Sequence, residues 1–201
     1  EISLGLVGSE MCIRDSYIFD GKKGLYKEND IPNPVNYYGL TKLIGEELTH
    51  MHDLSCVIRP SAIYGLGGSK KSFAEYVAEK LSNREKVYAL VDQTVSPTYN
   101  TLLAMAITEI IEMGFIGILH IAGERMSRYE FAIRIAEALK LPKDLLNKAR
   151  VVDMKHWIAQ RPKDSSLNVN KARSMLKTRF YDTDLALRLF RQEWLESKRR
   201  L

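Results

Sequence analysis

The chain has 201 residues, of which 45% are hydrophobic and 27% charged, and no apolar run approaches the length of a membrane span. The net charge of +5 comes from dispersed Lys and Arg residues that concentrate only in the terminal SKRRL, which excludes a basic stripe for nucleic acid. The two cysteines, Cys12 and Cys56, form neither a disulfide framework nor a CxxC pair. We therefore expect a cytoplasmic protein that binds neither membranes nor nucleic acid.

Short apolar runs alternate with helical patterns from about residue 17 onward, which is typical of an α/β fold. YIFDG (17–21) reads as the end of a strand, a helix is expected over 35–52, and SCVIRP (55–60) is the next buried strand. The later pattern predicts helices over 72–82, 101–114, 127–141 and from about 182, and strands over 86–93 and 117–123.

Helix-end signals support several of these segments. Ser127 and Glu130 have the spacing of a capping box before an apolar face. Gly114 predicts the end of the helix over 101–114. The last helix is amphipathic, with Leu185, Leu187, Phe190 and Trp194 on one side. His50 and His52 near a helix end point in different directions and have no third ligand nearby, so no metal site is expected.

The first sixteen residues, EISLGLVGSEMCIRDS, do not follow the α/β pattern. They open like a strand, but Gly5 and Gly8 are followed by neither a third glycine nor a helix. The sequence therefore has no glycine-rich phosphate turn here. Because VGSEMCIRDS resembles translated adapter sequence, we predict that residues 1–16 are non-native; a natural but divergent N-terminus is the alternative.

Tyr38 and Lys42 form a Y-x-x-x-K pair within PNPVNYYGLTK (32–42). Residues four apart lie on one face of a helix, so the Lys42 ammonium should lie beside the Tyr38 phenol. An unperturbed tyrosine has a pKa of about 10, so a tyrosine that acts as an acid near neutral pH needs a neighbouring positive charge. Spacing alone does not distinguish this arrangement from a solvated helix surface.

Four segments resemble, in order, the extended short-chain dehydrogenase/reductases, and within them the dTDP-4-dehydrorhamnose reductase-like branch. They are YIFDGKKGLYKENDIPNPVNYYGLTKLIGEE, VIRPSAIYG, VDQTVSPTYN and RPKDSSLNVNKA. The resemblance implies the C-terminal part of a Rossmann-type doubly wound sheet plus a small α/β substrate-binding domain. Residues 17–66 and parts of 84–122 would form the first, and 67–83 and 123–201 the second.

In that family a hydride passes from a nicotinamide to the C4 ketone of a nucleotide-linked sugar, while a tyrosine protonates the alkoxide. By position, Tyr38 would be this acid, and Lys42 would bind the nicotinamide ribose and lower the pKa of the tyrosine. The resemblance thus implies NADP or NAD as the cofactor and a nucleotide sugar as the substrate. The family also suggests a homodimer.

Further site residues are implied by position. Arg161 matches the Arg-Pro motif whose guanidinium binds the substrate diphosphate; a surface ion pair with Asp164 is the alternative. Arg59 and Pro60 match the cofactor cleft at the end of a strand. Residues that match the floor of the substrate cleft are Asp92, Gln93, Pro97 and Thr98. The Pro-Thr pair could equally mark a turn before the next helix.

Two departures from the family pattern affect the expected function. Arg14, Asp15 and Ser16 stand where the family has Ser-Thr-Asp, so the hydroxyl that orients the ketone is missing from its position. Ala62 replaces an aromatic residue of rhamnose-pathway members, which leaves a wider class of deoxysugars open. We expect the parent protein to be an NAD(P)H-dependent reductase of a 4-keto-deoxysugar, and this chain to show little turnover. The alternatives are a nucleotide-sugar epimerase or dehydratase, and a non-catalytic subunit similar to the methionine adenosyltransferase regulatory subunit.

Overall fold

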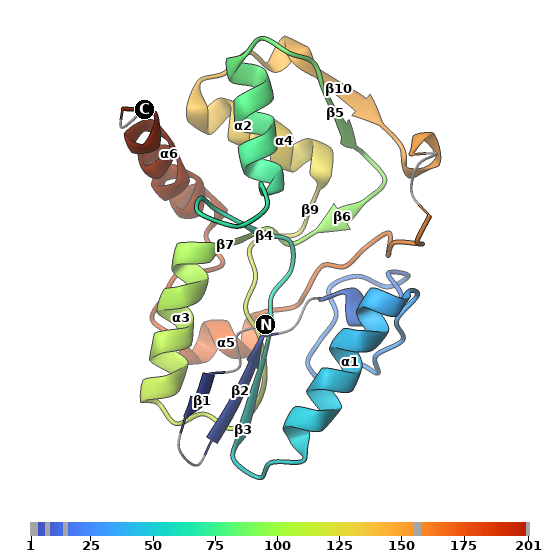
Figure 1. Cartoon of the computed structure of the whole chain (residues 1–201), viewed down its shortest axis with the longest axis vertical. Helices are drawn as coiled ribbons and strands as arrows, with labels where there is room; N and C mark the ends of the chain where they lie inside the picture. The colour runs from blue at the N-terminus through green and yellow to red at the C-terminus, as the bar shows by residue number, and fades with distance from the viewer. Residues whose placement is uncertain (1–3, 7–8, 14–15, 155–157, 200–201) are drawn as a thin grey trace.

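The computed structural model describes residues 4–6, 9–13, 16–154 and 158–199. The helices are α1 Tyr37–His50, α2 Phe73–Ser82, α3 Asn100–Glu112, α4 Arg128–Leu139, α5 Asn170–Met175 and α6 Thr183–Arg199. The strands are β1 Leu4–Leu6, β2 Ser9–Ile13, β3 Ser55–Arg59, β4 Ile63–Tyr64, β5 Val87–Leu90, β6 Thr94–Val95, β7 Thr98–Tyr99, β8 Gly117–His120, β9 Met126–Ser127 and β10 Leu146–Ala149. These elements form two parts, one above the other in Figure 1.

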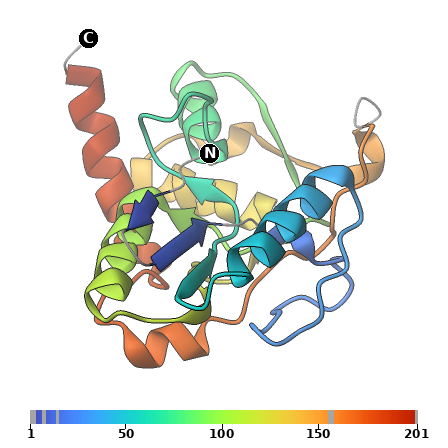
Figure 2. The ribbon, with the colours of Figure 1, turned by 60° about the horizontal axis from the view of Figure 1, so that its bottom comes forward.

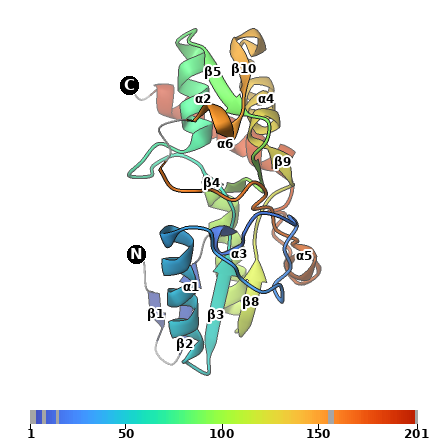
Figure 3. The ribbon, with the colours of Figure 1, turned by 90° about the vertical axis from the view of Figure 1, so that its right-hand side faces the viewer.

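The lower part is a sheet with the strand order β1-β2-β3-β8. β2, β3 and β8 run parallel, whereas β1 pairs antiparallel with β2. Every residue of β3 is buried, as expected for a central strand covered on both faces. Figures 1 and 2 show α1 and α3 on opposite sides of these strands, and Figure 3 shows the sheet beyond α1. This is the layered α/β arrangement that the sequence predicted.

The upper part contains the parallel pair β5–β10, with α2, α4 and α6 packed beside it. Its apolar side chains join those of the sheet in one core, which contains Ile58 and Leu119 as well as Phe131, Ile135 and Phe190. The segment after residue 158 runs between the two parts on its way to α5. Residues from both parts of the chain therefore meet along this segment.

The expected helices are confirmed, and so are the strands expected over 55–60, 86–93 and 117–123. The expected strand end at 17–21 is wrong, because Ser16–Ile18 form a short 3-10 helix. Ser127 and Glu130 form the predicted capping box of α4, with Glu130 N donating to Ser127 Oγ at 3.1 Å and Ser127 N to Glu130 Oε2 at 2.6 Å. Gly114 follows α3 with a φ of +59°, a left-handed conformation that favours glycine. The sequence analysis did not predict β10 or α5.

Residues 1–16 contain β1 and β2, and β2 pairs with β3 in parallel register from Glu10–Ser55 to Ile13–Ile58. Our prediction that this stretch is non-native stays a prediction. The division into residues 17–66 and 84–122 on one side, and 67–83 and 123–201 on the other, also stays a prediction.

Most of the regularly spaced apolar side chains of α1 do not point into the core. Leu40, Ile44 and Leu48 are exposed, whereas Glu46 and Thr49 are buried. A charged residue can occupy the inner face only if it has a partner there. The partner, as described below, determines how α1 is rotated about its axis.

Candidate functional site

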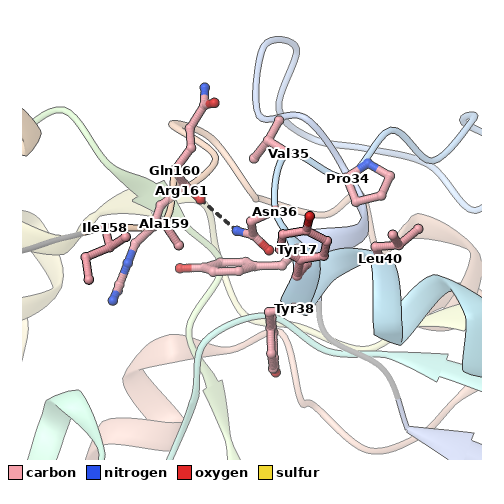
Figure 4. Close-up of a pocket in the computed structure, with 11 residues that line it drawn as sticks. Tyr17, Pro34, Val35, Asn36, Tyr38, Leu40, Ile158, Ala159, Gln160 and Arg161 are labelled. Atoms are coloured by element: carbon pink, nitrogen blue, oxygen red, sulfur yellow. Dashed lines mark hydrogen bonds between the residues drawn. The ribbon is translucent and has the colours of Figure 1, made fainter.

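The candidate site begins at the first turn of α1. Asn36 has an extended backbone and caps the helix, because its side-chain Oδ1 accepts a hydrogen bond from Gly39 N at 2.8 Å. Its Nδ2 donates to Gln160 O at 2.7 Å, as Figure 4 shows. Gly39 packs against the short 3-10 helix Ser16–Ile18, since a Cβ at this position would lie 2.2 Å from Tyr17 O. The helix start is therefore held by contacts on two sides.

Tyr38 and Lys42 lie together, as their spacing predicted. Lys42 Nζ is 5.3 Å from the centroid of the Tyr38 ring. The Tyr38 ring also meets the Tyr17 ring edge to face, with centroids 5.8 Å apart. Tyr38 remains 48% exposed, so a ligand can reach it. The catalytic roles of Tyr38 and Lys42 stay predictions.

A hollow of about 850 Å³ opens beside this helix start. Segment 34–40, which contains Tyr38, forms one wall with Tyr17, and segment 158–161, which ends at Arg161, forms another. The volume lies within the range of small-molecule sites. Two side chains that the sequence analysis assigned to different ends of one substrate, Tyr38 and Arg161, thus line a single hollow although they are far apart in the chain.

A second hollow of about 830 Å³ adjoins the first, because Val35 and segment 158–161 line both. Its lining is strongly charged. The basic side chains there are Lys22, Arg125, Arg161 and Lys163, and the acidic ones are Asp20, Asp92 and Asp164. Together the two hollows form an extended site whose polar end lies beyond Arg161.

The acidic residues of the second hollow already have partners. Arg125 donates to Asp164 Oδ2 from Nε at 2.9 Å and from Nη2 at 2.6 Å. This, and not a pair with Arg161, is the ion pair that the structure gives Asp164. The Tyr26 hydroxyl donates to Asp20 at 2.6 Å and, with the Lys22 backbone N–H, lowers the pKa of the Asp20 carboxyl.

The predicted residues of the cleft floor separate into one exposed and three buried side chains. Asp92 is exposed, lines the second hollow and accepts a hydrogen bond from Val151 N. Gln93 is buried, and its Oε1 accepts from Arg128 Nε at 2.6 Å. Thr98 is also buried, with its hydroxyl donating to Ser61 O at 2.6 Å, and the Pro97 carbonyl accepts from Gly123 N. Gln93, Pro97 and Thr98 therefore lie beneath the surface of the site. Contact between the substrate and any of the four predicted residues stays a prediction.

Arg59 lies inside the fold and not in the hollow. Its side chain is 2% exposed, and Nε donates to Glu46 Oε2 at 3.0 Å while Nη2 donates to Glu46 Oε1. Pro60 is buried too, and its carbonyl accepts from Ser16 N at 3.1 Å. The structure thus gives Arg59 a role in joining β3 to α1. The predicted cofactor contacts of Arg59 and Pro60 stay predictions.

His120 extends this buried network. Its Nδ1 is 3.0 Å from Tyr26 O, and its Nε2 is 3.3 Å from Arg59 Nη1. The carbonyl can only accept, so Nδ1 carries the proton and Nε2 accepts from the guanidinium. Burial and the charge of Arg59 lower the pKa of His120 to about 3, which keeps the imidazole neutral.

Tyr17 and Asn36 are site residues that the sequence analysis missed. Asn36 could have been recognised as a helix cap, because it precedes Gly39 by three residues and follows a proline-rich approach. Ser16 is buried, and its neighbours Arg14 and Asp15 lie outside the described residues. Among residues 16–154 and 158–199, no three His, Cys, Asp or Glu side chains gather as metal ligands would. No helix in the same part of the chain is long and apolar enough to cross a membrane.

Comparison with known proteins shows which family has this arrangement. The model of the RmlD substrate-binding domain matches residues 12–193. The chain belongs to this family. The RmlD-type assignment confirms the predicted resemblance, and the related solved structures confirm the Rossmann-type α/β fold.

Three relatives illustrate the range of the RmlD-like proteins. The crystal structure of a hypothetical dTDP-4-dehydrorhamnose reductase from Sulfolobus tokodaii is 44% identical, with a TM-score of 0.78, and covers 88% of this chain and 62% of that chain. The Bacillus anthracis dTDP-4-dehydrorhamnose reductase in complex with NADP is 26% identical, with a TM-score of 0.83 and coverages of 91% and 65%. Methionine adenosyltransferase 2 subunit beta of Bos taurus is 32% identical over 81% of this chain and 51% of its own length. The chain thus spans between about half and two thirds of these relatives.

Proposed function

We propose that the chain is part of an NAD(P)H-dependent reductase that acts on the 4-keto group of a nucleotide-linked deoxysugar. The observation that carries the proposal is the single hollow lined by both Tyr38 and Arg161, with Lys42 against the Tyr38 ring. The family membership and the NADP complex of the Bacillus anthracis relative support it. We expect proteins of this type to be cytoplasmic homodimers. Sedimentation of the purified chain would test whether it forms a dimer.

In this proposal Tyr38 is the general acid. NADPH or NADH supplies a hydride to the ketone carbon when bound. The phenol of Tyr38 donates its proton to the alkoxide that forms, and the Lys42 ammonium stabilises the resulting tyrosinate. The exposure of Tyr38 and the short distance between Lys42 Nζ and its ring are compatible with contacts to the ribose and nicotinamide end of such a cofactor.

Arg161 has a different role in the proposal, which is to hold the diphosphate of the nucleotide sugar. Its exposed guanidinium presents a planar set of donors that matches phosphate oxygens. The basic side chains of Lys163 and Lys22 in the adjoining hollow add positive charge on the same side. The sugar would then lie between Arg161 and Tyr38, with Asp92 at the edge of the second hollow.

The test is oxidation of NADPH or NADH by a dTDP-4-keto-6-deoxysugar. Tyr38→Phe should lower the measured rate about 10²- to 10⁴-fold, the usual contribution of a general acid. Tyr88→Phe, at an exposed tyrosine of β5, is the matched control. Equal rates for the two variants would reject Tyr38 as the acid.

A second candidate function is that of a non-catalytic binding subunit. Its support is the 32% identity to methionine adenosyltransferase 2 subunit beta, together with Arg14 and Asp15 at the positions where the family has Ser and Thr. Affinity purification from a source cell would test this function. A stable heteromeric partner, together with nucleotide-sugar reduction that is insensitive to Tyr38→Phe, would favour the subunit over the enzyme.

A further inference from the structure

Asn36 connects the two walls of the first hollow with one side chain. Oδ1 accepts from Gly39 N at 2.8 Å inside the first turn of α1, and Nδ2 donates to Gln160 O at 2.7 Å, 124 residues away. The two neighbours fix the orientation of the amide, since a backbone N–H requires the oxygen and a carbonyl requires the NH₂ group. Figure 4 shows this second bond crossing from the helix start to segment 158–161.

The hydrogen bond from Asn36 Nδ2 to Gln160 O, here called the bridge, lies close in the chain to two residues of the site. Tyr38 lies two residues after Asn36, and Arg161 directly follows Gln160. The first turn of α1 is already fixed, because Gly39 abuts the Tyr17 carbonyl and the rings of Tyr17 and Tyr38 are in contact. The Asn36–Gln160 bond therefore places the backbone of segment 158–161 relative to a turn that cannot easily shift.

We propose that Asn36 is a positioning residue that sets the separation between Tyr38 and Arg161, and that it thereby makes the site selective for substrates carrying a nucleoside diphosphate. This inference rests on the proposed function of these two residues. A fixed backbone at segment 158–161 reduces the number of positions that the Arg161 guanidinium can reach. Less of the binding free energy is then spent on ordering the segment when the diphosphate binds.

Two substitutions separate the bridge from the helix cap. Asn36→Asp and Asn36→Ser both keep an oxygen that can cap α1, because Asp, Ser and Asn are comparable at this position. Neither has the amide donor that reaches Gln160 O. Asp adds a negative charge whereas Ser does not, so an effect shared by both variants reports the lost donor. Ser72→Ala removes the cap of α2 and serves as the control for a weakened helix start away from the hollow.

The primary measurement is calorimetric binding of dTDP to the whole chain. Arg161→Ala should weaken binding about tenfold to a hundredfold, as for a charge-assisted hydrogen bond, and leave it measurable. Both Asn36 variants should weaken it about threefold to tenfold, the usual contribution of one neutral hydrogen bond. Ser72→Ala should bind like the wild type. In an Arg161→Ala background the Asn36 substitutions should have no further effect, because Asn36 acts through Arg161.

The outcomes distinguish an incorrect proposal about the Asn36–Gln160 bridge from an incorrect proposed function. If dTDP binds and Arg161→Ala weakens this, but both Asn36 variants bind like the wild type, the bridge proposal is wrong. The bridge proposal would also be overturned if the Asn36 substitutions weakened dTDP binding equally in the wild type and in the Arg161→Ala variant. If the wild type does not bind dTDP, the proposed function fails, and hydrogen exchange of the amides at 158–163 decides the bridge. Faster exchange in Asn36→Ser than in Ser72→Ala supports positioning, and identical exchange rejects it.

Discussion

Arg59 and Glu46 form an ion pair that is buried between β3 and α1, with Arg59 Nε 3.0 Å from Glu46 Oε2. Glu46 is four residues after Lys42 and eight after Tyr38, so the three side chains follow one another along one side of α1. Because a buried carboxylate must stay with its partner, the pair fixes the rotation of the helix. That rotation leaves Leu40, Ile44 and Leu48 exposed and directs the start of the helix toward the hollow.

Removing one member of this pair should be strongly destabilising. Glu46→Ala leaves the Arg59 guanidinium buried without its carboxylate, which typically costs about 3–5 kcal/mol of unfolding free energy. Urea unfolding followed by circular dichroism would measure this loss. Glu79→Ala, on α2, breaks the exposed pair with Lys71 and should cost far less than Glu46→Ala. Similar losses in the two variants would mean that the Glu46–Arg59 pair is not effectively buried in solution.

The neutral His120 should make the fold sensitive to mild acid. Its pKa is about 3 in the folded chain and near 6.5 when unfolded, so the unfolded chain binds the extra proton between these values. Stability from this group is therefore complete above about pH 6.5 and declines as the pH falls, by at most about 1.4 kcal/mol per pH unit. Unfolding free energies measured from pH 7 to pH 4.5 would show the slope, and Asp and Glu, with pKa values of about 4, contribute only toward the lower end of this range.

The variant His120→Gln provides the control for this pH dependence. Glutamine can donate to Tyr26 O but does not titrate, so the slope between pH 4.5 and 6.5 should become shallower even if the variant is less stable throughout. His50→Gln, at an exposed position on α1, should keep the wild-type slope. An unchanged slope in His120→Gln would show that other groups cause the acid sensitivity.

Adding a single methyl group at Gly39 should disturb the helix start. The Cβ of Gly39→Ala would lie 2.2 Å from the Tyr17 carbonyl oxygen, a backbone atom, so α1 or the 3-10 helix Ser16–Ile18 must move. We expect a loss of about 1–3 kcal/mol in unfolding free energy, as for other overpacked sites, together with weaker dTDP binding. Thr41→Ala on the exposed side of the same turn should change stability by less than about 0.5 kcal/mol. A stable Gly39→Ala variant would contradict this close packing.

Lys42 should matter for the rate even when Tyr38 is intact. Lys42→Met removes the positive charge 5.3 Å from the Tyr38 ring and keeps a side chain of similar length. For each unit by which the pKa of Tyr38 rises when the Lys42 charge is lost, the equilibrium shifts about tenfold away from tyrosinate. We expect turnover to fall at least about tenfold and the rate profile to move to higher pH. Lys80→Met, in an exposed pair with Glu85, is the control, and a rate equal to it would exclude a role for Lys42.

Several features of the fold could be predicted because their causes are local. The capping box at Ser127 and Glu130 and the left-handed Gly114 depend only on residues within one or two helical turns. The Tyr38–Lys42 contact has the same origin, since the helical repeat places the two side chains together. The pairing of β5 with β10 was not predicted, because no pattern within either segment specifies a partner so distant in the chain.

The sequence by itself determined the family, the α/β class with its longer helices and three main strands, and the face of α1 that carries Tyr38 and Lys42. Only the tertiary structure decided that Arg59 is buried against Glu46, and that Asn36 joins the helix start to the backbone beside Arg161. The reason is that helix periodicity and capping act between near neighbours. Burial of a charge and a hydrogen bond over 124 residues depend on how distant segments pack, which no single stretch of sequence specifies.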